Sequence, residues 1–130
     1  MNINEYIADF EAQIQSAAIV ASYTLHVDRK TDDIAFLSGR IDFRDESVLD
    51  FKEFLAATEH GIDKLKYGYN YRTDTEMRFR YDNAPDPRAR ALASYPHHKH
   101  LSSDEIIPSK EVTLAETLEE VESAILRIRS

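Results

Sequence analysis

The sequence predicts an α+β domain in which a five-stranded, mostly antiparallel meander sheet is packed by helices from both ends of the chain. Two patterns with helical spacing lie near the termini, and five segments with strand character lie between them. Short connections favour pairing between strands that are neighbours along the chain. A length of 130 residues fits one domain, which we expect to span residues 1–130.

Residues 3–17 are predicted to form the first helix. Apolar side chains recur there every three or four residues, which places them on one helix face. These side chains are Ile3, Tyr6, Ile7, Phe10 and Ile14. Asn2 or Asn4 is expected to cap the helix start, since an Asn side chain accepts hydrogen bonds from unpaired amides of the first turn.

The first three strands are expected at residues 20–29, 33–43 and 48–56. Apolar and polar residues alternate in the second and third strands, as they do when one face of a strand is buried. The residues predicted on the core face are Ala35, Leu37, Ile41, Phe43, Leu49 and Phe51.

The fourth and fifth strands, expected at residues 64–71 and 77–82, carry an aromatic stripe. A three-residue loop at 73–75 gives the register that best separates aromatic from polar side chains. The predicted pairs are Tyr71–Met77, Tyr69–Phe79, Tyr67–Tyr81, Asn70–Arg78 and Lys66–Asp82. Leu65 is expected on the aromatic face. That face is predicted to be core beneath the helices, with a base-stacking platform as the alternative.

Residues 83–110 are predicted to form a long irregular region, in which residues 88–92 are a candidate helical turn and Pro96 and Pro108 bracket an extended piece. A loop of this length is usually functional or disordered. A second helix follows, and Thr113 and Glu116 have the spacing of a capping box at its start. Its apolar face is formed by Leu114, Leu118, Val121, Ile125 and Ile128.

Composition excludes several classes of protein. The net charge of −8 argues against a protein that coats duplex nucleic acid, although residues 64–100 hold eight Lys or Arg against four Asp or Glu. That segment forms either a basic patch or the ordinary solvated face of its strands. The absence of cysteine removes disulfides and thiolate sites. No apolar stretch is long enough to span a membrane, and the chain start is unlike a signal peptide, so we expect a cytoplasmic location.

Histidines and charged residues gather in the fifth strand and in the Pro96–His100 segment. Histidine exchanges protons near neutral pH, and Arg or Lys can hold a phosphate, so the sequence favours metal-free acid–base chemistry. The predicted catalytic residues are Arg80, Asp82, His98 and His100, the predicted phosphate-binding residues are Arg78 and Lys99, and Tyr81, Asn83 and His97 complete the candidate site. In an extended segment, His98 and His100 would point the same way and His97 the opposite way.

Two other interpretations of these residues remain open. His98 and His100 could bind a transition metal with Asp82 as third ligand, although the set is incomplete and no metal or other cofactor is expected. Alternatively, the three histidines only tie the loop down by hydrogen bonds, while Arg80 pairs with Asp82 or Asp86.

The segments FRYDNAP and PHHKH resemble the TumE family of small prokaryotic toxin–antitoxin proteins. The strand segments SGRIDFRDESVLDFKEF and KYGYNYRTDTEMRFRYDN extend the resemblance, which covers residues 19–110. It implies a TumE-like domain that acts as a toxin and has a cognate antitoxin. The candidate residues within the matching segments are Arg80, Tyr81, Asp82, Asn83, His97, His98, Lys99 and His100. The resemblance assigns them no catalytic role.

The leading functional prediction is therefore the toxin of a two-gene module that acts on RNA, with a cognate antitoxin and RNA as partners and no membrane. The first alternative is a non-catalytic module that binds nucleic acid or protein through the basic sheet face. The second is a metal-dependent hydrolase built on the histidines. Self-association into a homo-oligomer is a further expectation.

Overall fold

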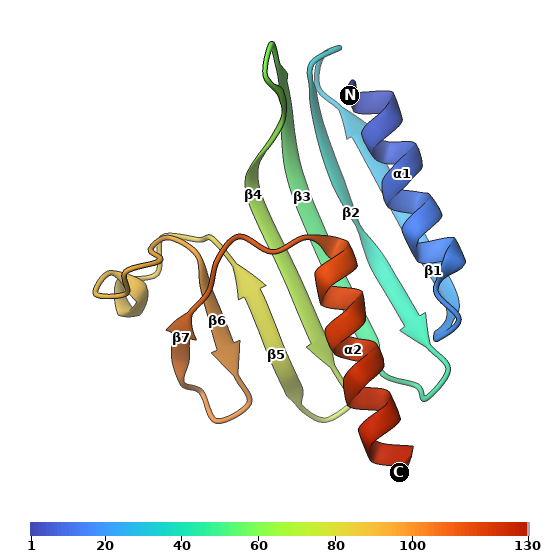
Figure 1. Cartoon of the computed structure of the whole chain (residues 1–130), viewed down its shortest axis with the longest axis vertical. Helices are drawn as coiled ribbons and strands as arrows, with labels where there is room; N and C mark the ends of the chain where they lie inside the picture. The colour runs from blue at the N-terminus through green and yellow to red at the C-terminus, as the bar shows by residue number, and fades with distance from the viewer. Residues whose placement is uncertain (130) are drawn as a thin grey trace.

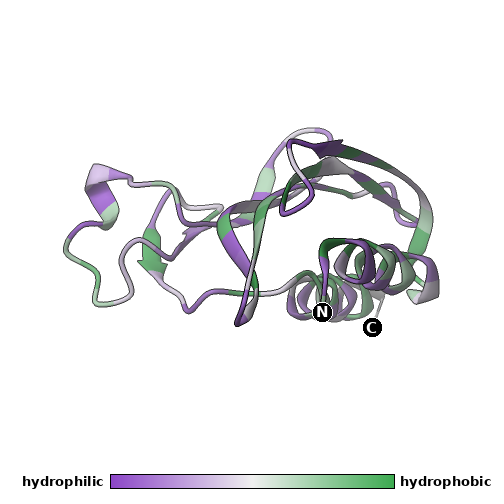
Figure 2. Ribbon diagram, turned by 90° about the horizontal axis from the view of Figure 1, so that it is seen from above, coloured by the Kyte–Doolittle hydropathy of each residue, from purple (hydrophilic) through white to green (hydrophobic). Residues whose placement is uncertain are grey.

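The computed structural model describes residues 1–129, with side chains placed as far as Arg127. Helices α1 (Ile3–Ser16) and α2 (Leu114–Arg129) pack on one face of a single sheet (Figures 1 and 2). The strands are β1 (Val20–Arg29), β2 (Ile34–Phe43), β3 (Val48–Thr58), β4 (Gly61–Arg72), β5 (Met77–Asp82), β6 (His98–Leu101) and β7 (Ile106–Pro108). All neighbouring strands pair antiparallel in chain order. The α+β class and both terminal helices are confirmed, but the sheet has seven strands instead of five.

The two additional strands lie within residues 83–110, which were expected to be irregular. β6 is only four residues long and β7 only three, and a histidine-rich segment lacks the apolar alternation that marks a longer strand. A 3₁₀ helix, η1 (Pro87–Ala89), lies close to the helical turn expected at 88–92. The extended piece expected between Pro96 and Pro108 is present, but its pairing with β5 as two further strands of the sheet was not predicted.

Both helix starts are capped as the sequence predicts. Asn2 Oδ1 accepts a hydrogen bond from the amide of Glu5 at 2.8 Å, and the Glu5 carboxylate accepts one from the Asn2 amide. The same reciprocal box joins Thr113 and Glu116 before α2, with both distances at 3.1 Å. Ile128, predicted on the apolar face of α2, lies outside the described side chains.

The aromatic stripe of β4 and β5 is core. Tyr67, Tyr69 and Tyr71 are buried, and adjacent rings of the stripe lie 5.3–5.5 Å apart between their centroids. The stripe packs under α1 and α2 together with apolar residues of β2 and β3. The expected core role is confirmed, and the rings are covered, so they do not form an open stacking platform.

The register between β4 and β5 differs from the predicted one by two residues. Tyr71 pairs with Phe79, and Gly68 pairs with Asp82. The turn has four residues, closed by a 2.9 Å hydrogen bond from the Thr73 amide to the Glu76 carbonyl, and Arg78 is the extra residue of a bulge. A shift of two keeps residues 79–82 on their predicted faces, because the side-chain period of a strand is also two. Met77 lies before the bulge and pairs with Arg72, so its predicted place opposite Tyr71 is wrong.

A bulge between β3 and β4 reverses the facing of two side chains. Phe54 pairs with Lys66 and Leu55 with Lys64, which leaves Leu65 as the extra residue. Leu65 is 49% exposed, so its predicted place on the aromatic face is wrong. Lys64 instead turns into the core.

Lys64 joins a buried polar network under α1. The Glu53 carboxylate accepts hydrogen bonds from the hydroxyls of Tyr6 and Tyr69, while Lys64 Nζ donates to the Tyr69 hydroxyl at 2.7 Å and to the Val112 carbonyl at 2.5 Å. Lys64 Nζ lies 3.9 Å from Glu53. Burial raises the pKa of Glu53 and lowers that of Lys64. The network ties α1 and the segment before α2 to the centre of the sheet.

Removing one member of the network is expected to destabilise the protein more than removing both charges. Glu53→Leu leaves the buried ammonium of Lys64 without its carboxylate partner, so we expect the free energy of unfolding to fall by about 3–5 kcal/mol. Glu53→Leu/Lys64→Met removes both charges and should recover most of that loss. Urea unfolding of wild type and both variants measures the difference. A double variant as unstable as the single one would contradict the expectation.

Candidate functional site

The face of the sheet opposite the helices carries two rows of mostly polar residues. Residues paired across adjacent strands point to the same face, so each row can be followed through the register. The first row runs Lys52, Gly68, Asp82 and His98, and the second runs Asp50, Asn70, Arg80 and His100. Each row draws one residue from each of β3, β4, β5 and β6.

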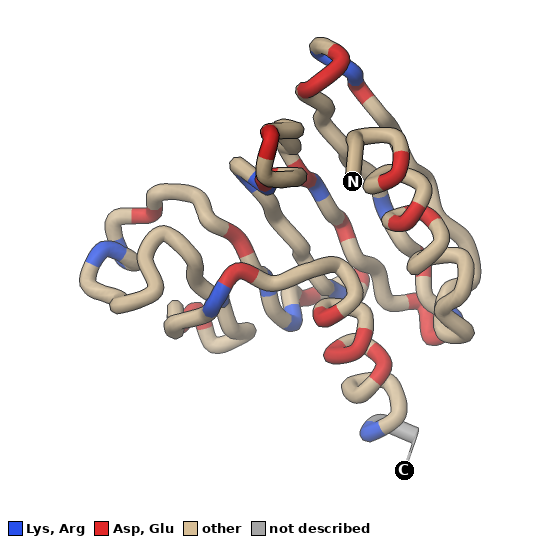
Figure 3. The backbone as a smooth tube through the Cα atoms, turned by 45° about the horizontal axis from the view of Figure 1, so that its top comes forward, with Lys and Arg blue, Asp and Glu red and all other residues tan. Residues whose placement is uncertain are grey.

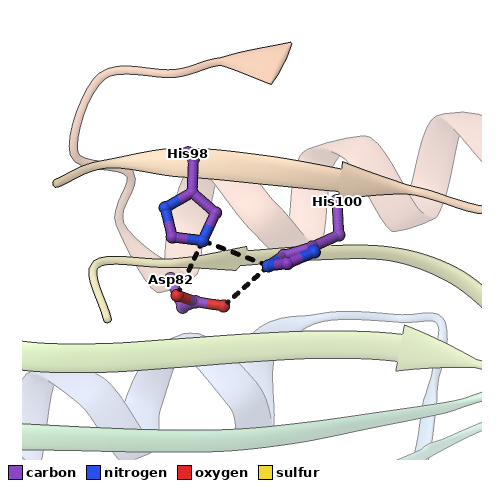
Figure 4. Close-up of side chains that lie close together, drawn as sticks. All are labelled: Asp82, His98 and His100. Carbon is purple, nitrogen blue, oxygen red and sulfur yellow. Dashed lines mark hydrogen bonds and ion pairs between the residues drawn. The ribbon is translucent and has the colours of Figure 1, made fainter. Parts of the chain in front are cut away.

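Asp82, His98 and His100 form a compact cluster at the β5–β6 end of these rows (Figure 4). His98 Nε2 lies 3.1 Å from Asp82 Oδ1, and His100 Nε2 lies 3.4 Å from Asp82 Oδ2. The two Nε2 atoms are 3.1 Å apart. The sequence-based expectation that both histidines point the same way is confirmed.

The cluster is buried although it lies on the face that the helices leave open. His98 is 0% exposed, Asp82 2% and His100 9%. Segment 83–97 supplies contacts to the cluster: the Ala84 amide donates to Asp82 Oδ1 at 2.9 Å, and the Pro96 carbonyl lies 2.7 Å from His98 Nδ1. Burial lowers the pKa of His100. The Asp82 carboxylate raises this pKa, and the positive charge of Arg80 lowers it further.

Arg80 links the buried cluster to solvent. Its Nε donates to Asp82 Oδ2 at 2.7 Å, while its side chain is 47% exposed. The ion pair that the sequence offered as one alternative for Arg80 is thus present with Asp82. A guanidinium has five N–H groups, so this bond leaves donors for a ligand.

A groove of about 600 Å³ opens beside Arg80. Gly68 forms part of its lining and has no side chain, and a Cβ there would lie 3.1 Å from Lys52 Cε. The other lining residues come from β3, β4, β5 and the two ends of segment 83–97; they are Asp50, Phe51, Lys52, Leu65, Lys66, Tyr67, Asn70, Arg80, Asp82, Asn83, Ala84, Pro85 and Pro96. Glycine therefore lets the groove reach the sheet between Lys52 and Asp82.

Several groove residues were not singled out from the sequence. Lys52 and Lys66 are exposed and form no ion pair with the described residues, whereas Asp50 is paired with Arg72 at 2.7 Å. Asn70 Oδ1 is buried and receives no hydrogen bond from the described part of the chain. The β3–β4 and β4–β5 registers together bring these residues near Arg80. The sequence pattern predicts pairing of Asn70 and Lys66 with β5 but no register between β3 and β4, so Lys52 and Asp50 could not be placed there.

The structure brings Arg80, Asp82, His98 and His100 together and separates other candidates from them. Lys99 Nζ pairs with Glu120 of α2 at 2.7 Å, and the Tyr81 hydroxyl donates to the same carboxylate at 2.5 Å. Both side chains therefore lie on the helix-covered face, which contradicts a phosphate-binding place for Lys99 beside the histidines. Arg78 lies in the β5 bulge and pairs with Glu76 at 3.3 Å.

His97 and Asn83 have partners of their own. His97 stacks on Tyr67 and its Nδ1 lies 2.9 Å from the Tyr67 hydroxyl, so it points away from His98 as expected. The Asn83 side chain accepts from the Tyr67 amide and donates to the Leu65 carbonyl, both at 3.0 Å. Asn83 therefore completes backbone pairing at the β4 bulge.

A family model described as Toxin TumE matches residues 8–128. The chain belongs to the TumE toxin family. Searches of curated proteins and of solved structures gave no match. Membership confirms the resemblance seen in the sequence and indicates the toxin component of a toxin–antitoxin module, with a cognate antitoxin as partner. Among the described residues, neither helix of this TumE protein has the length and apolar character needed to cross a membrane.

Asn83→Ala tests the assignment of Asn83 as a residue that completes the β4 backbone. The variant leaves the Tyr67 amide and the Leu65 carbonyl without their partner, so the free energy of unfolding should fall by about 1–3 kcal/mol. Asn70→Ala is the matched control, since the Asn70 amide group makes no hydrogen bond with the described residues. Equal destabilisation in the two variants, measured by urea unfolding, would contradict this assignment.

Proposed function

We propose that this TumE protein is a toxin that acts on RNA, and that it binds the RNA backbone in the groove beside Arg80. The observation that carries the proposal is the set of cations along the groove. Lys52, Lys66 and the exposed part of Arg80 line it, while the carboxylates of Asp50 and Asp82 are already engaged by arginines. Unpaired ammonium groups and free guanidinium donors are suited to phosphate oxygens.

The distribution of charge supports this choice of face. Acidic residues are frequent along both helices (Figure 3). They belong to the helical layer, which packs on the other side of the sheet from the groove. A polyanion is repelled by the helical layer and attracted to the groove, so the net charge of −8 does not oppose RNA binding there.

Asn70 adds a reason to favour RNA over DNA. Asn70 belongs to the groove lining, and its buried Oδ1 lacks a donor among the described residues. An unpaired buried acceptor is unfavourable, and a ligand hydroxyl would satisfy it once the Asn70 side chain turns toward the groove. The ribose 2′-hydroxyl is the donor that distinguishes RNA from DNA.

Binding without catalysis is a second candidate, and the burial of the histidines favours it. His98 is fully buried, and of the three cluster residues it is Asp82 that belongs to the groove lining, so acid–base catalysis at a bound phosphate would have to pass through Asp82. Arg80 is the member of the predicted catalytic set that offers free donors to a ligand in this conformation. Cleavage products, or their absence, after incubation with RNA separate the two candidates.

Neutralising the two lysines should reduce the salt dependence of RNA binding. Each single-strand phosphate contact contributes about −0.7 to the slope of log K against log salt, so Lys52→Ala/Lys66→Ala should reduce the magnitude of that slope by ~1.4. Lys30→Ala/Lys110→Ala removes the same charge at sites paired with Asp28 and Glu116, away from the groove. Fluorescence anisotropy with a single-stranded oligoribonucleotide measures both slopes. Equal slopes for the two double variants would refute phosphate binding in the groove.

Growth assays test the toxin role itself. Expression of the protein alone should arrest growth, and co-expression of the antitoxin should restore it. Gly68→Val fills the groove lining and should abolish the arrest, whereas Lys30→Ala/Lys110→Ala should retain it. Arrest that persists in a folded Gly68→Val protein would rule out the groove as the toxic site, and no arrest by wild type would remove the toxin role.

A further inference from the structure

Three potential ligand atoms converge where β5 meets β6. One oxygen of Asp82 and one nitrogen each of His98 and His100 lie within 4.8 Å of one another, and all three residues are buried (Figure 4). We propose that these residues bind a divalent transition-metal ion. The proposal concerns the cluster itself and does not depend on RNA being the target.

Hydrogen bonding of His98 gives the first reason. His98 Nδ1 lies 2.7 Å from the Pro96 carbonyl, which can only accept, so Nδ1 carries the proton in this contact. In the neutral ring, Nε2 then presents a lone pair to Asp82 Oδ1 at 3.1 Å. Two acceptors facing each other in a buried place repel, and a cation between them removes the repulsion.

The third atom favours a metal ion over a single shared proton. A proton on His98 Nε2 bridges that nitrogen to one acceptor, but His100 Nε2 lies equally close, also at 3.1 Å. A metal ion accepts all three lone pairs at once. For metal–ligand bonds of about 2.0–2.1 Å, tetrahedral geometry separates the ligand atoms by about 3.3 Å. Three separations lie near that value: 3.1 Å between the two Nε2 atoms, 3.1 Å from His98 Nε2 to Asp82 Oδ1, and 3.4 Å from His100 Nε2 to the other carboxylate oxygen, Oδ2. A single Asp82 oxygen bound together with both nitrogens still lies within 4.8 Å of them.

The groups around the cluster already hold the ligands in place. Metal-binding histidines generally donate their second N–H to a carbonyl or carboxylate, and ligating carboxylates are themselves hydrogen-bonded. His98 has the Pro96 carbonyl, while Asp82 accepts from the Ala84 amide through Oδ1 and from Arg80 through Oδ2. This support orients the ligands before any ion arrives.

Ligand type narrows the choice of ion. Two imidazoles with one carboxylate occur in zinc sites and in non-haem iron(II) sites, where further positions remain open to water or substrate. Hard ions such as Mg²⁺ and Ca²⁺ prefer all-oxygen ligand sets. Arg80 opposes any cation through its charge, but it also leaves the loaded site net positive at the end of the groove.

Metal titration of protein purified without a histidine tag and stripped with chelator tests the proposal. We expect one Zn²⁺ per chain by calorimetry, and a Co²⁺ absorption spectrum with nitrogen and oxygen ligands. His98→Ala and His100→Ala should each weaken binding by at least ~10-fold. His26→Ala/His60→Ala removes two exposed imidazoles elsewhere and should bind as wild type.

Measurement on the wild type keeps the test valid if a histidine variant fails to fold. X-ray absorption of the zinc-loaded protein should show two imidazoles and one carboxylate around the ion. Absence of stoichiometric binding, a shell without two imidazoles, or loss of binding in His26→Ala/His60→Ala would overturn the proposal. The lysine salt-slope experiment, repeated with chelator-treated protein, reports on RNA binding separately, so the two proposals can fail independently.

Discussion

The structure depends on one constraint: a seven-stranded meander has two faces, and its two helices cover only one of them. Side chains alternate along each strand, so the residue next to an aromatic side chain that packs under α1 or α2 points to the opposite face. Packing Tyr67, Tyr69 and the partly buried Tyr81 under the helices therefore places Gly68, Arg80 and Asp82 together on the uncovered side. The candidate site follows from the same alternation that forms the core.

The alternation explains how much could be predicted from the sequence. The helices, their caps and the facing of β5 follow from local patterns, because capping and apolar periodicity act over a few residues. The β4–β5 register could not be derived, since a bulge and a fourth turn residue shift it by two without moving residues 79–82 to the other face. The bulge at Leu65 does change facing, and it depends on Asn83, sixteen or more residues away, to complete its backbone pairing.

Short strands are the second feature that the sequence pattern could not predict. β6 is recognisable only through its pairing with β5, because a segment that alternates histidine with lysine has no apolar face. The expectation that His98 and His100 would meet Asp82 came from residue chemistry, and the structure supplies the pairing that brings them together. The same pairing carries Lys99 to the other face and to Glu120. The residue types therefore indicated where the site lies, while the strand pairing determined which of the candidate residues lie in it.

The proposed toxin action and the proposed metal site place different demands on one region. RNA binding requires accessible cations, which Lys52 and Lys66 provide at the groove, whereas the buried histidines are suited to a ligand that is small and cationic.

Amide chemical shifts of the ¹⁵N-labelled protein, recorded while a single-stranded oligoribonucleotide is added, test the central claim most directly. We predict the largest changes at Lys52, Gly68 and Asn70, and weaker binding of the matching deoxyoligonucleotide. Changes confined to α1, α2 or β1 would contradict the account.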